Sequence, residues 1–253
     1  MYPELSSVPS ALQPIDPGDH LERRTRALDV GAGVGRVTSD VLLHLVSDVV
    51  LLEPVESFVN EALVRARGEA SASSSDNMNE KNNIWKGLAN QTRSVTILQG
   101  TLQEFDPLYP HRVKFLDRVG YQPAWPVADV GAGYDVIWCQ WCLGHLSDAD
   151  LVAFLRRSSA ALRKDGTKER SLIVVKENLC SDNADGTGKT VFDEQDSSLT
   201  RQVYSLYYWV INRITVTSRS DKAWKHLFKL AELKVVKEQV QHGFPGLLYK
   251  VKM

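Results

Sequence analysis

A chain of 253 residues, of which 43% are hydrophobic and 24% charged, can bury one sizeable core, and we expect one main domain. The formal net charge of −1 gives no global electrostatic reason to bind nucleic acid or an anionic membrane surface, so we expect neither as a partner. Three cysteines suit a reducing compartment, and the lack of a signal pattern or an apolar run of about 18 residues favours a soluble protein of the cytoplasm or nucleus.

The chain opens with an irregular, proline-containing arm, residues 1–23, and we expect one domain to fill residues 24–253. The domain begins with a strand at 27–30, a glycine turn and a helix at 36–46, because an apolar run is followed by helical apolar spacing. Further strands are predicted at 49–52, 95–98, 134–138 and 171–176, and further helices at 58–67, 149–162 and 223–233.

Two stretches interrupt this alternation. Residues 70–83 are rich in Ser and Asn and read as a polar, mobile insertion, while 203–216 are rich in Tyr, Trp and Val without a clear helical stripe. Residues 247–252 are predicted to return as a final edge strand. Strands that alternate with helices predict an α/β protein of the Rossmann-like type, with a mostly parallel sheet and helices on both faces.

The strongest motif is Asp29-Val-Gly-Ala-Gly-Val-Gly-Arg36 at the first strand-to-helix turn, with Glu53 at the end of the next strand, about 20 residues later. Glycines let the backbone pass close to a ligand, and a carboxylate at the end of the second strand can accept hydrogen bonds from both ribose hydroxyls. An ordinary tight turn explains the glycines alone, but their combination with Glu53 favours an adenosine-containing cofactor.

Three other segments resemble sites but lack a necessary part. Residues 129–133 repeat Asp-Val-Gly-Ala-Gly, yet they precede a predicted strand and do not open a helix. Residues 183–190 resemble a phosphate-binding loop, with Asn183 where its first glycine belongs. Cys139 and Cys142 have metal-ligand spacing without a second pair, so we expect structural cysteines and no metal.

The glycine spacing separates two cofactor classes. The run reads Gly-x-Gly-x-Gly, whereas dinucleotide-binding folds use Gly-x-Gly-x-x-Gly. It resembles the first motif of class I methyltransferases, and residues 134–138 resemble their fourth strand, whose end faces the methyl donor. This resemblance implies S-adenosylmethionine as the cofactor and a seven-stranded-type sheet.

A narrower resemblance rests on four segments. Trp138 to Asp148, Phe154 to Arg157, Val175 to Asn178 and Phe192 to Ser198 together look like the protein N-terminal methyltransferase family. The similarity runs from about Leu28 to Arg201 and resumes near Asp221, and it implies methylation of the free α-amino group of proteins that begin X-Pro-Lys or X-Pro-Arg. The family pattern does not predict residues 202–220, an atypical insertion, and its aromatic, glycine-rich opening segment is not found before residue 27.

Carried over by position, the resemblance implies two sets of site residues. Those around S-adenosylmethionine are Gly31, Arg36, Glu53, Pro54, Leu102, Gln103 and Gln140. Those along the peptide channel are Trp141, His145, Asn178, Asp193, Asp196 and Ser198. We assign Asp196, with His145, to proton acceptance and Asn178 to orienting the amine, while Trp141, Asp193 and Ser198 bind the peptide.

Each of these assignments has a plainer alternative. Trp141 fits a core aromatic, His145 fits a residue at a helix start, and the acidic cluster around Asp193 fits a solvated loop. At the level of function, two alternatives stay open. One is a methyltransferase that acts on a small molecule, and the other is a cofactor-binding family member with impaired catalysis. The oligomeric state and the degree of methylation have no signal in the sequence.

Overall fold

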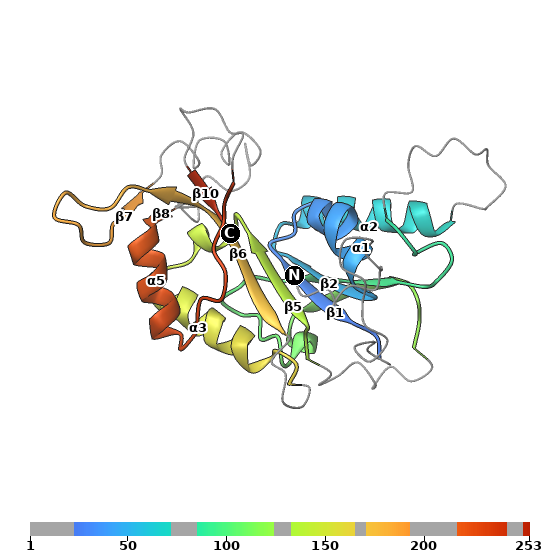
Figure 1. Ribbon diagram of the computed structural model, residues 1–253. Helices are drawn as coiled ribbons and strands as arrows, with labels where there is room; N and C mark the ends of the chain where they lie inside the picture. The colour runs from blue at the N-terminus through green and yellow to red at the C-terminus, as the bar shows by residue number, and fades with distance from the viewer. Residues whose placement is uncertain (1–22, 72–84, 124–132, 165–170, 193–216, 242–249) are drawn as a thin grey trace. The chain divides into compact units, whose positions relative to one another are not determined.

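The computed structural model describes residues 23–71, 85–123, 133–164, 171–192, 217–241 and 250–253 (Figure 1). The chain divides into two compact units. The first comprises Met1–Trp138 and Arg157–Val174, and the second comprises Cys139–Arg156 and Val175–Met253. Strands β5 (Val136–Gln140) and β6 (Leu172–Cys180) begin in the first unit and end in the second.

The sheet of the first unit has the strand order β4-β3-β2-β1-β5-β6. Strand β2 pairs in parallel with both β1 and β3, so the predicted mostly parallel α/β fold is confirmed. Every residue of β1 and β2 is buried, which explains why most of their residues are apolar, because helices and loops cover both faces of a parallel sheet. The strands are β1 (Arg26–Val30), β2 (Asp48–Glu53), β3 (Ser94–Gln99) and β4 (Lys114–Gly120).

The helices of the first unit follow the predicted order. The predicted helix at 36–46 contains a π-helical stretch, η3 (Thr38–Leu42), followed by α1 (Leu43–Leu45). Helix α2 (Glu56–Ser71) packs against β2, β3 and β4. A short 3-10 helix, η4 (Pro110–Arg112), precedes β4. The predicted insertion at 70–83 begins inside α2, and the rest of it lies outside the described residues.

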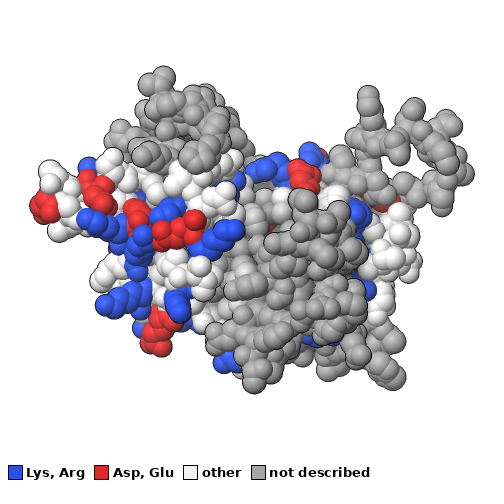
Figure 2. All heavy atoms as spheres, viewed as in Figure 1, with Lys and Arg blue, Asp and Glu red and all other residues white. Residues whose placement is uncertain are grey.

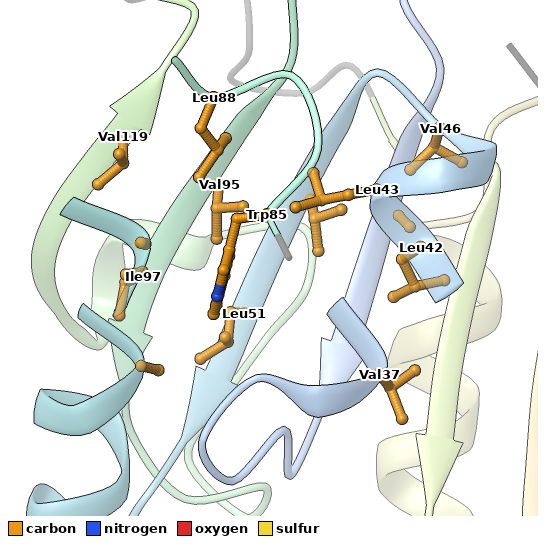
Figure 3. Close-up of a cluster of buried hydrophobic side chains, with 14 of the residues drawn as sticks. Val37, Leu42, Leu43, Val46, Leu51, Trp85, Leu88, Val95, Ile97 and Val119 are labelled. Carbon is orange, nitrogen blue, oxygen red and sulfur yellow. The ribbon is translucent and has the colours of Figure 1, made fainter. Parts of the chain in front are cut away.

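The core of the first unit gathers around Trp85, which is almost fully buried. Figure 3 shows its ring among Leu43 of α1, Leu51 of β2 and Val95 of β3. Trp85 therefore bridges the helix that follows the glycine turn and two neighbouring strands. This packing holds the glycine turn against the sheet edge where β1 and β2 end.

Strand β4 was not predicted from the sequence. It pairs antiparallel with β3, and the register shifts between Ile97 and Leu98. Its sequence, Lys-Phe-Leu-Asp-Arg-Val-Gly, has no clear alternation, and Phe115 is exposed. Edge strands carry charged and polar side chains because they face solvent. The sequence of β4 therefore shows no strand pattern, and only its pairing with β3 identifies it as a strand.

The second unit combines short strands with two capped helices. Helix α3 (Asp148–Ala160) begins there, and Ser147 and Asp150 form a reciprocal cap at its first turn. Helix α5 (Asp221–Leu230) begins at Ser220, whose hydroxyl accepts a hydrogen bond from the Ala223 amide. The other elements are η6 (Leu143–His145), β7 (Thr190–Phe192), β8 (Thr217–Ser220), β9 (Val240–Gln241) and β10 (Lys250–Lys252).

The pairing in the second unit corrects one prediction. Residues 250–252 of the predicted edge strand form β10, but β10 lies between β6 and β9 and is antiparallel to both. The prediction of an edge position was wrong because the two-residue β9 has no pattern of its own. Strand β8 pairs in parallel with β6, so the last four residues of the 202–220 segment are part of the sheet.

Ion pairs cover the described surface near α5, where Figure 2 shows basic and acidic side chains intermixed. Lys225 contacts Asp221 and Glu238 at 2.9 and 3.0 Å, and Lys252 contacts the same two carboxylates. This network ties the start of α5 to β10. In the part of the chain that the structure describes, no helix combines the length and the apolar character needed to cross a bilayer.

Candidate functional site

Glu53 ends β2 with its carboxylate already oriented. One oxygen accepts a hydrogen bond from the Gly33 amide at 2.9 Å, and the other accepts one from the Val55 amide, also at 2.9 Å. Burial raises the pKa of this carboxyl above its usual value, although both amide hydrogen bonds oppose that rise. Each oxygen keeps a lone pair for a further donor, so the carboxylate can still accept hydrogen bonds from a pair of hydroxyls.

The glycine turn brings its backbone to Glu53 through positive φ angles. Gly31, Gly33 and Gly35 have φ values of 61°, 58° and 82°. A Cβ at Gly33 would meet nothing within 4 Å, whereas a Cβ at Gly35 would lie 2.5 Å from the Trp85 ring. Gly33 therefore leaves open space beside Glu53, and Gly35 is required for packing. This geometry fits an adenosyl group whose ribose approaches the turn.

Asp29 is a buried carboxyl near the end of β1, and no role was predicted for it from the sequence. It accepts a hydrogen bond from the Thr38 hydroxyl at 2.7 Å, which joins the strand before the turn to η3 after it. Burial raises the pKa of Asp29 from 3.8 to about 7, although Thr38 acts in the opposite direction. Its signal in the sequence is its place two residues before the first glycine.

The loop after β3 carries two predicted cofactor residues, Leu102 and Gln103. Leu102 is buried and Gln103 is exposed. Arg157 donates hydrogen bonds to three carbonyl oxygens of this loop, those of Leu102, Gln103 and Phe105, at 2.9, 3.4 and 3.2 Å. Arg157 lies in a segment that supports the family resemblance, but its partners are more than 50 residues away and give no local signal.

The remaining predicted cofactor residues have simpler surroundings. Arg36 and Pro54 are exposed, at the helix start after the glycine turn and directly after Glu53. Gln140 is half-buried at the end of β5, in the second unit. Among the predicted cofactor residues, Glu53 contacts the glycine turn directly, because its side chain accepts a hydrogen bond from the Gly33 amide.

Trp141 follows β5 and lies on the surface. It is 42% exposed, its φ is 56°, and the Lys176 ammonium lies 5.1 Å from the centre of its ring. A non-glycine residue with positive φ carries strain, and a buried core aromatic would not be this accessible. The alternative that Trp141 is a core residue is therefore wrong, and the strained, accessible ring fits a ligand-facing role.

The turn that follows Trp141 carries His145. Glu177 is buried, and one of its carboxylate oxygens accepts hydrogen bonds from the Cys142 and Leu143 amides at 3.0 and 2.9 Å. His145 is exposed at the end of η6, and Asn178 is half-buried on β6, directly after Glu177. The sequence reading assigned no role to Glu177. Its position beside Asn178 is the signal that could have identified it.

The other predicted channel residues, Asp193, Asp196 and Ser198, lie outside the described residues. The loop that resembles a phosphate-binding turn closes on itself, because the Asn183 side chain donates to Thr187 and to the Gly188 carbonyl. Within the described ranges, no three His, Cys, Asp or Glu side chains gather as metal ligands would.

Comparisons with known proteins identify relatives over most of the chain. A family model described as AdoMet-dependent proline di-methyltransferase matches residues 11–107 and 110–214. Alpha N-terminal protein methyltransferase 1 of Schizosaccharomyces pombe is 34% identical over 227 residues, which are 90% of this chain and 69% of that protein. N-terminal Xaa-Pro-Lys N-methyltransferase 1 of Danio rerio is 30% identical over 225 residues, 89% of this chain and 69% of that protein.

A solved structure supports the same relationship. A SAM-dependent methyltransferase of Leishmania major superimposes with a TM-score of 0.56 and 25% sequence identity, over 94% of this chain and 65% of that chain. Other curated relatives are covered over little more than half of their length. The present chain therefore spans between about half and seven tenths of the length of these curated relatives.

Proposed function

Because this chain belongs to the AdoMet-dependent proline di-methyltransferase family, we propose that it methylates the free α-amino group of protein N-termini that begin X-Pro-Lys or X-Pro-Arg. The structural observation that carries the acceptor part of the proposal is Trp141, an accessible aromatic ring on a strained backbone. A flat ring of this kind can pack against the proline at the second position of such a peptide.

The cofactor part of the proposal is carried by Glu53 and the glycine turn, which lie in the first unit. S-adenosylmethionine, when bound, supplies an activated methyl group on sulfur. Glu53, whose carboxylate is oriented by the Gly33 amide, would accept hydrogen bonds from the ribose hydroxyls, and the open space at Gly33 would let the ligand approach the backbone. Gly31, Arg36, Pro54, Leu102, Gln103 and Gln140 complete the proposed cofactor residues.

On the acceptor side, the chain must remove a proton. An α-amino group has an unperturbed pKa near 8, so it is largely protonated at neutral pH and has no lone pair with which to attack. Asp196, with His145, accepts that proton, and Asn178 orients the amine. Asp193 pairs with the basic third residue, and Ser198 binds the peptide backbone. Correct orientation supplies much of the rate.

A methyl-transfer assay tests the proposal. The substrates are an X-Pro-Lys peptide with a free N-terminus, the same peptide acetylated at its N-terminus, and a peptide with a neutral third residue. We expect methylation of the free peptide only, and weaker binding of the neutral variant. Equal methylation of the acetylated peptide would move the acceptor to a side chain.

Two other outcomes correspond to the alternative functions. Cofactor binding without peptide methylation would indicate a catalytically impaired family member, and methylation of small molecules alone would indicate a small-molecule enzyme. The division into an arm, residues 1–23, and one methyltransferase domain, residues 24–253, stays a prediction, as does location in the cytoplasm or nucleus.

A further inference from the structure

The turn from Trp141 to Leu146, called the acceptor turn below, is held from two sides by buried charges of opposite sign. On its amide side, Glu177 accepts hydrogen bonds from Cys142 and Leu143. On its carbonyl side, a guanidinium from β8 donates to the turn. Both contacts lie within the second unit.

That guanidinium belongs to Arg219, whose side chain is 1% exposed. It donates to the Leu146 carbonyl at 2.7 Å and to the Leu143 carbonyl at 3.4 Å. It also pairs with the Asp148 carboxylate at 2.8 Å, and its charge lies 5.3 Å from the centre of the Trp224 ring. Thr217, two residues before Arg219 on β8, donates its hydroxyl to the Gly144 carbonyl of the same turn at 2.8 Å.

Burying an arginine in a protein core costs free energy. Removing a guanidinium from water carries a large desolvation penalty, and apolar residues of similar volume often stabilise a fold as well or better. Its advantage is geometric, because a planar fork reaches several acceptors at fixed angles, which a lysine cannot do. Here the acceptors are the carbonyls on both sides of Gly144 and His145.

We propose that Arg219 and Glu177 are positioning residues that hold the acceptor turn, and so fix the directions in which Trp141 and His145 point. This inference rests on the proposed function for what Trp141 and His145 do, but not for how the turn is held. Thr217 and Arg219 both lie on β8, so this short strand contributes to the acceptor side.

The test compares Arg219→Met, Arg219→Lys and Thr217→Val. Arg156→Met is the matched control, because Arg156 also donates to a backbone carbonyl, that of Leu230 at 2.8 Å, but is exposed and away from the turn. Amide hydrogen exchange at residues 142–146 reports directly on the turn. Kinetics with an X-Pro-Lys peptide and calorimetric titration with S-adenosylmethionine separate the two sides of the reaction.

We expect Arg219→Met to speed exchange in the turn about tenfold or more and to lower kcat/KM for the peptide by about ten- to a hundredfold, with cofactor affinity unchanged. Arg219→Lys should restore part of both, and Arg156→Met should change neither. Thr217→Val should give a smaller change of the same kind, and it decides the matter if Arg219→Met does not fold.

Unchanged exchange in Arg219→Lys and Thr217→Val would overturn the proposal, whatever the kinetics. An equal loss of cofactor affinity in Arg219→Met would also overturn the assignment to the acceptor side. Faster exchange in a protein whose wild type methylates no peptide would support the holding role and contradict the proposed function instead. The two failures are therefore distinguishable.

Discussion

Glu53 and Trp141 each affect both the local backbone structure and the proposed binding of a ligand. Glu53 shapes the glycine turn with the same two oxygens that we assign to the ribose. Trp141 adopts a backbone conformation that glycine would adopt at no cost, and we propose that its ring contacts the peptide. Each case separates a contribution to folding from a contribution to binding, and each can be tested.

Replacing Glu53 with Ala should weaken S-adenosylmethionine binding by about 1.5–3 kcal/mol, because charge-assisted hydrogen bonds to the ribose are lost. Glu53→Gln should lie between the wild type and Glu53→Ala, since one acceptor oxygen remains. Calorimetric titration measures both. Glu61→Ala, an exposed carboxylate on α2, serves as the control. Wild-type affinity in Glu53→Ala would remove this residue from the site.

Replacing Trp141 with Gly should raise KM for an X-Pro-Lys peptide about tenfold or more, because an aromatic surface for proline is lost. The free energy of unfolding should change by no more than about 1 kcal/mol, since relief of the positive φ offsets the lost packing. Peptide kinetics and urea unfolding measure the two effects. A loss of about 3–5 kcal/mol, typical of a core aromatic, would contradict the ligand-facing role.

At the scale of elements, the strand, turn and helix around residues 26–45 form the part of the fold that the cofactor site depends on. Its glycines divide their tasks: Gly35 makes room for Trp85, and Gly33 faces open space beside Glu53. A hydrogen bond from the Thr38 hydroxyl to the Asp29 carboxylate joins β1, before the turn, to η3, after it. The motif therefore contains one position, Gly35, where a methyl group would disrupt packing, and one, Gly33, where we propose that it would obstruct the cofactor.

Gly35→Ala should lower the free energy of unfolding by about 2–5 kcal/mol, because it adds strain at φ 82° and overlaps the Trp85 ring. Gly33→Ala should lower it by only about 1–2 kcal/mol but weaken S-adenosylmethionine binding strongly. Urea unfolding and calorimetric titration give the comparison. Equal loss of stability in both variants would show that Gly33 is also a packing residue.

At the scale of the whole molecule, burial of a titratable group makes stability depend on pH. The Asp29 carboxyl has a pKa of about 7 in the fold and an ordinary value of 3.8. Between those values the native state keeps a proton that the unfolded chain has lost. Stability is therefore highest below about pH 4 for this group and falls as the pH rises through 7.

Asp29→Asn removes this titration. We expect the wild type to lose stability relative to Asp29→Asn by on the order of a few kcal/mol between pH 4 and 7, and little more above pH 8. Urea unfolding of both proteins across this range gives the difference at each pH, which cancels the other titrating groups. Parallel curves would show that Asp29 is ionised in the native state.

Elements with a strong local pattern could be predicted from the sequence, and elements defined by distant partners could not. Strands β1, β2 and β3 contain their predicted ranges, which the apolar residues marked, and each extends one residue further at one or both ends through polar residues such as Arg26, Asp48 and Gln99. Strands β4, β8 and β9 are short or polar, so only their pairing partners define them.

The same limit applies to the candidate site. Glu53 has a recognisable spacing from the glycine turn, and the structure places it in contact with Gly33. Arg157 and Arg219 bind backbone carbonyls 52 to 76 residues away. Every residue has a backbone carbonyl, so the sequence does not show which ones these side chains bind. The roles of Asp193, Asp196 and Ser198 stay predictions, since those residues lie outside the described ranges.

The grip of Arg157 on the loop after β3 also has a consequence for the order of events during synthesis on the ribosome. The loop from Leu102 to Phe105 leaves the exit tunnel about 50 residues before the side chain that fixes it. Until then its carbonyls are satisfied by water, and a nascent chain presents the glycine turn without an ordered loop beside it. If Leu102 and Gln103 bind S-adenosylmethionine as proposed, this part of the cofactor site becomes ordered only after Arg157, near the end of α3, has emerged, and the cofactor would then stabilise the protein late in its maturation.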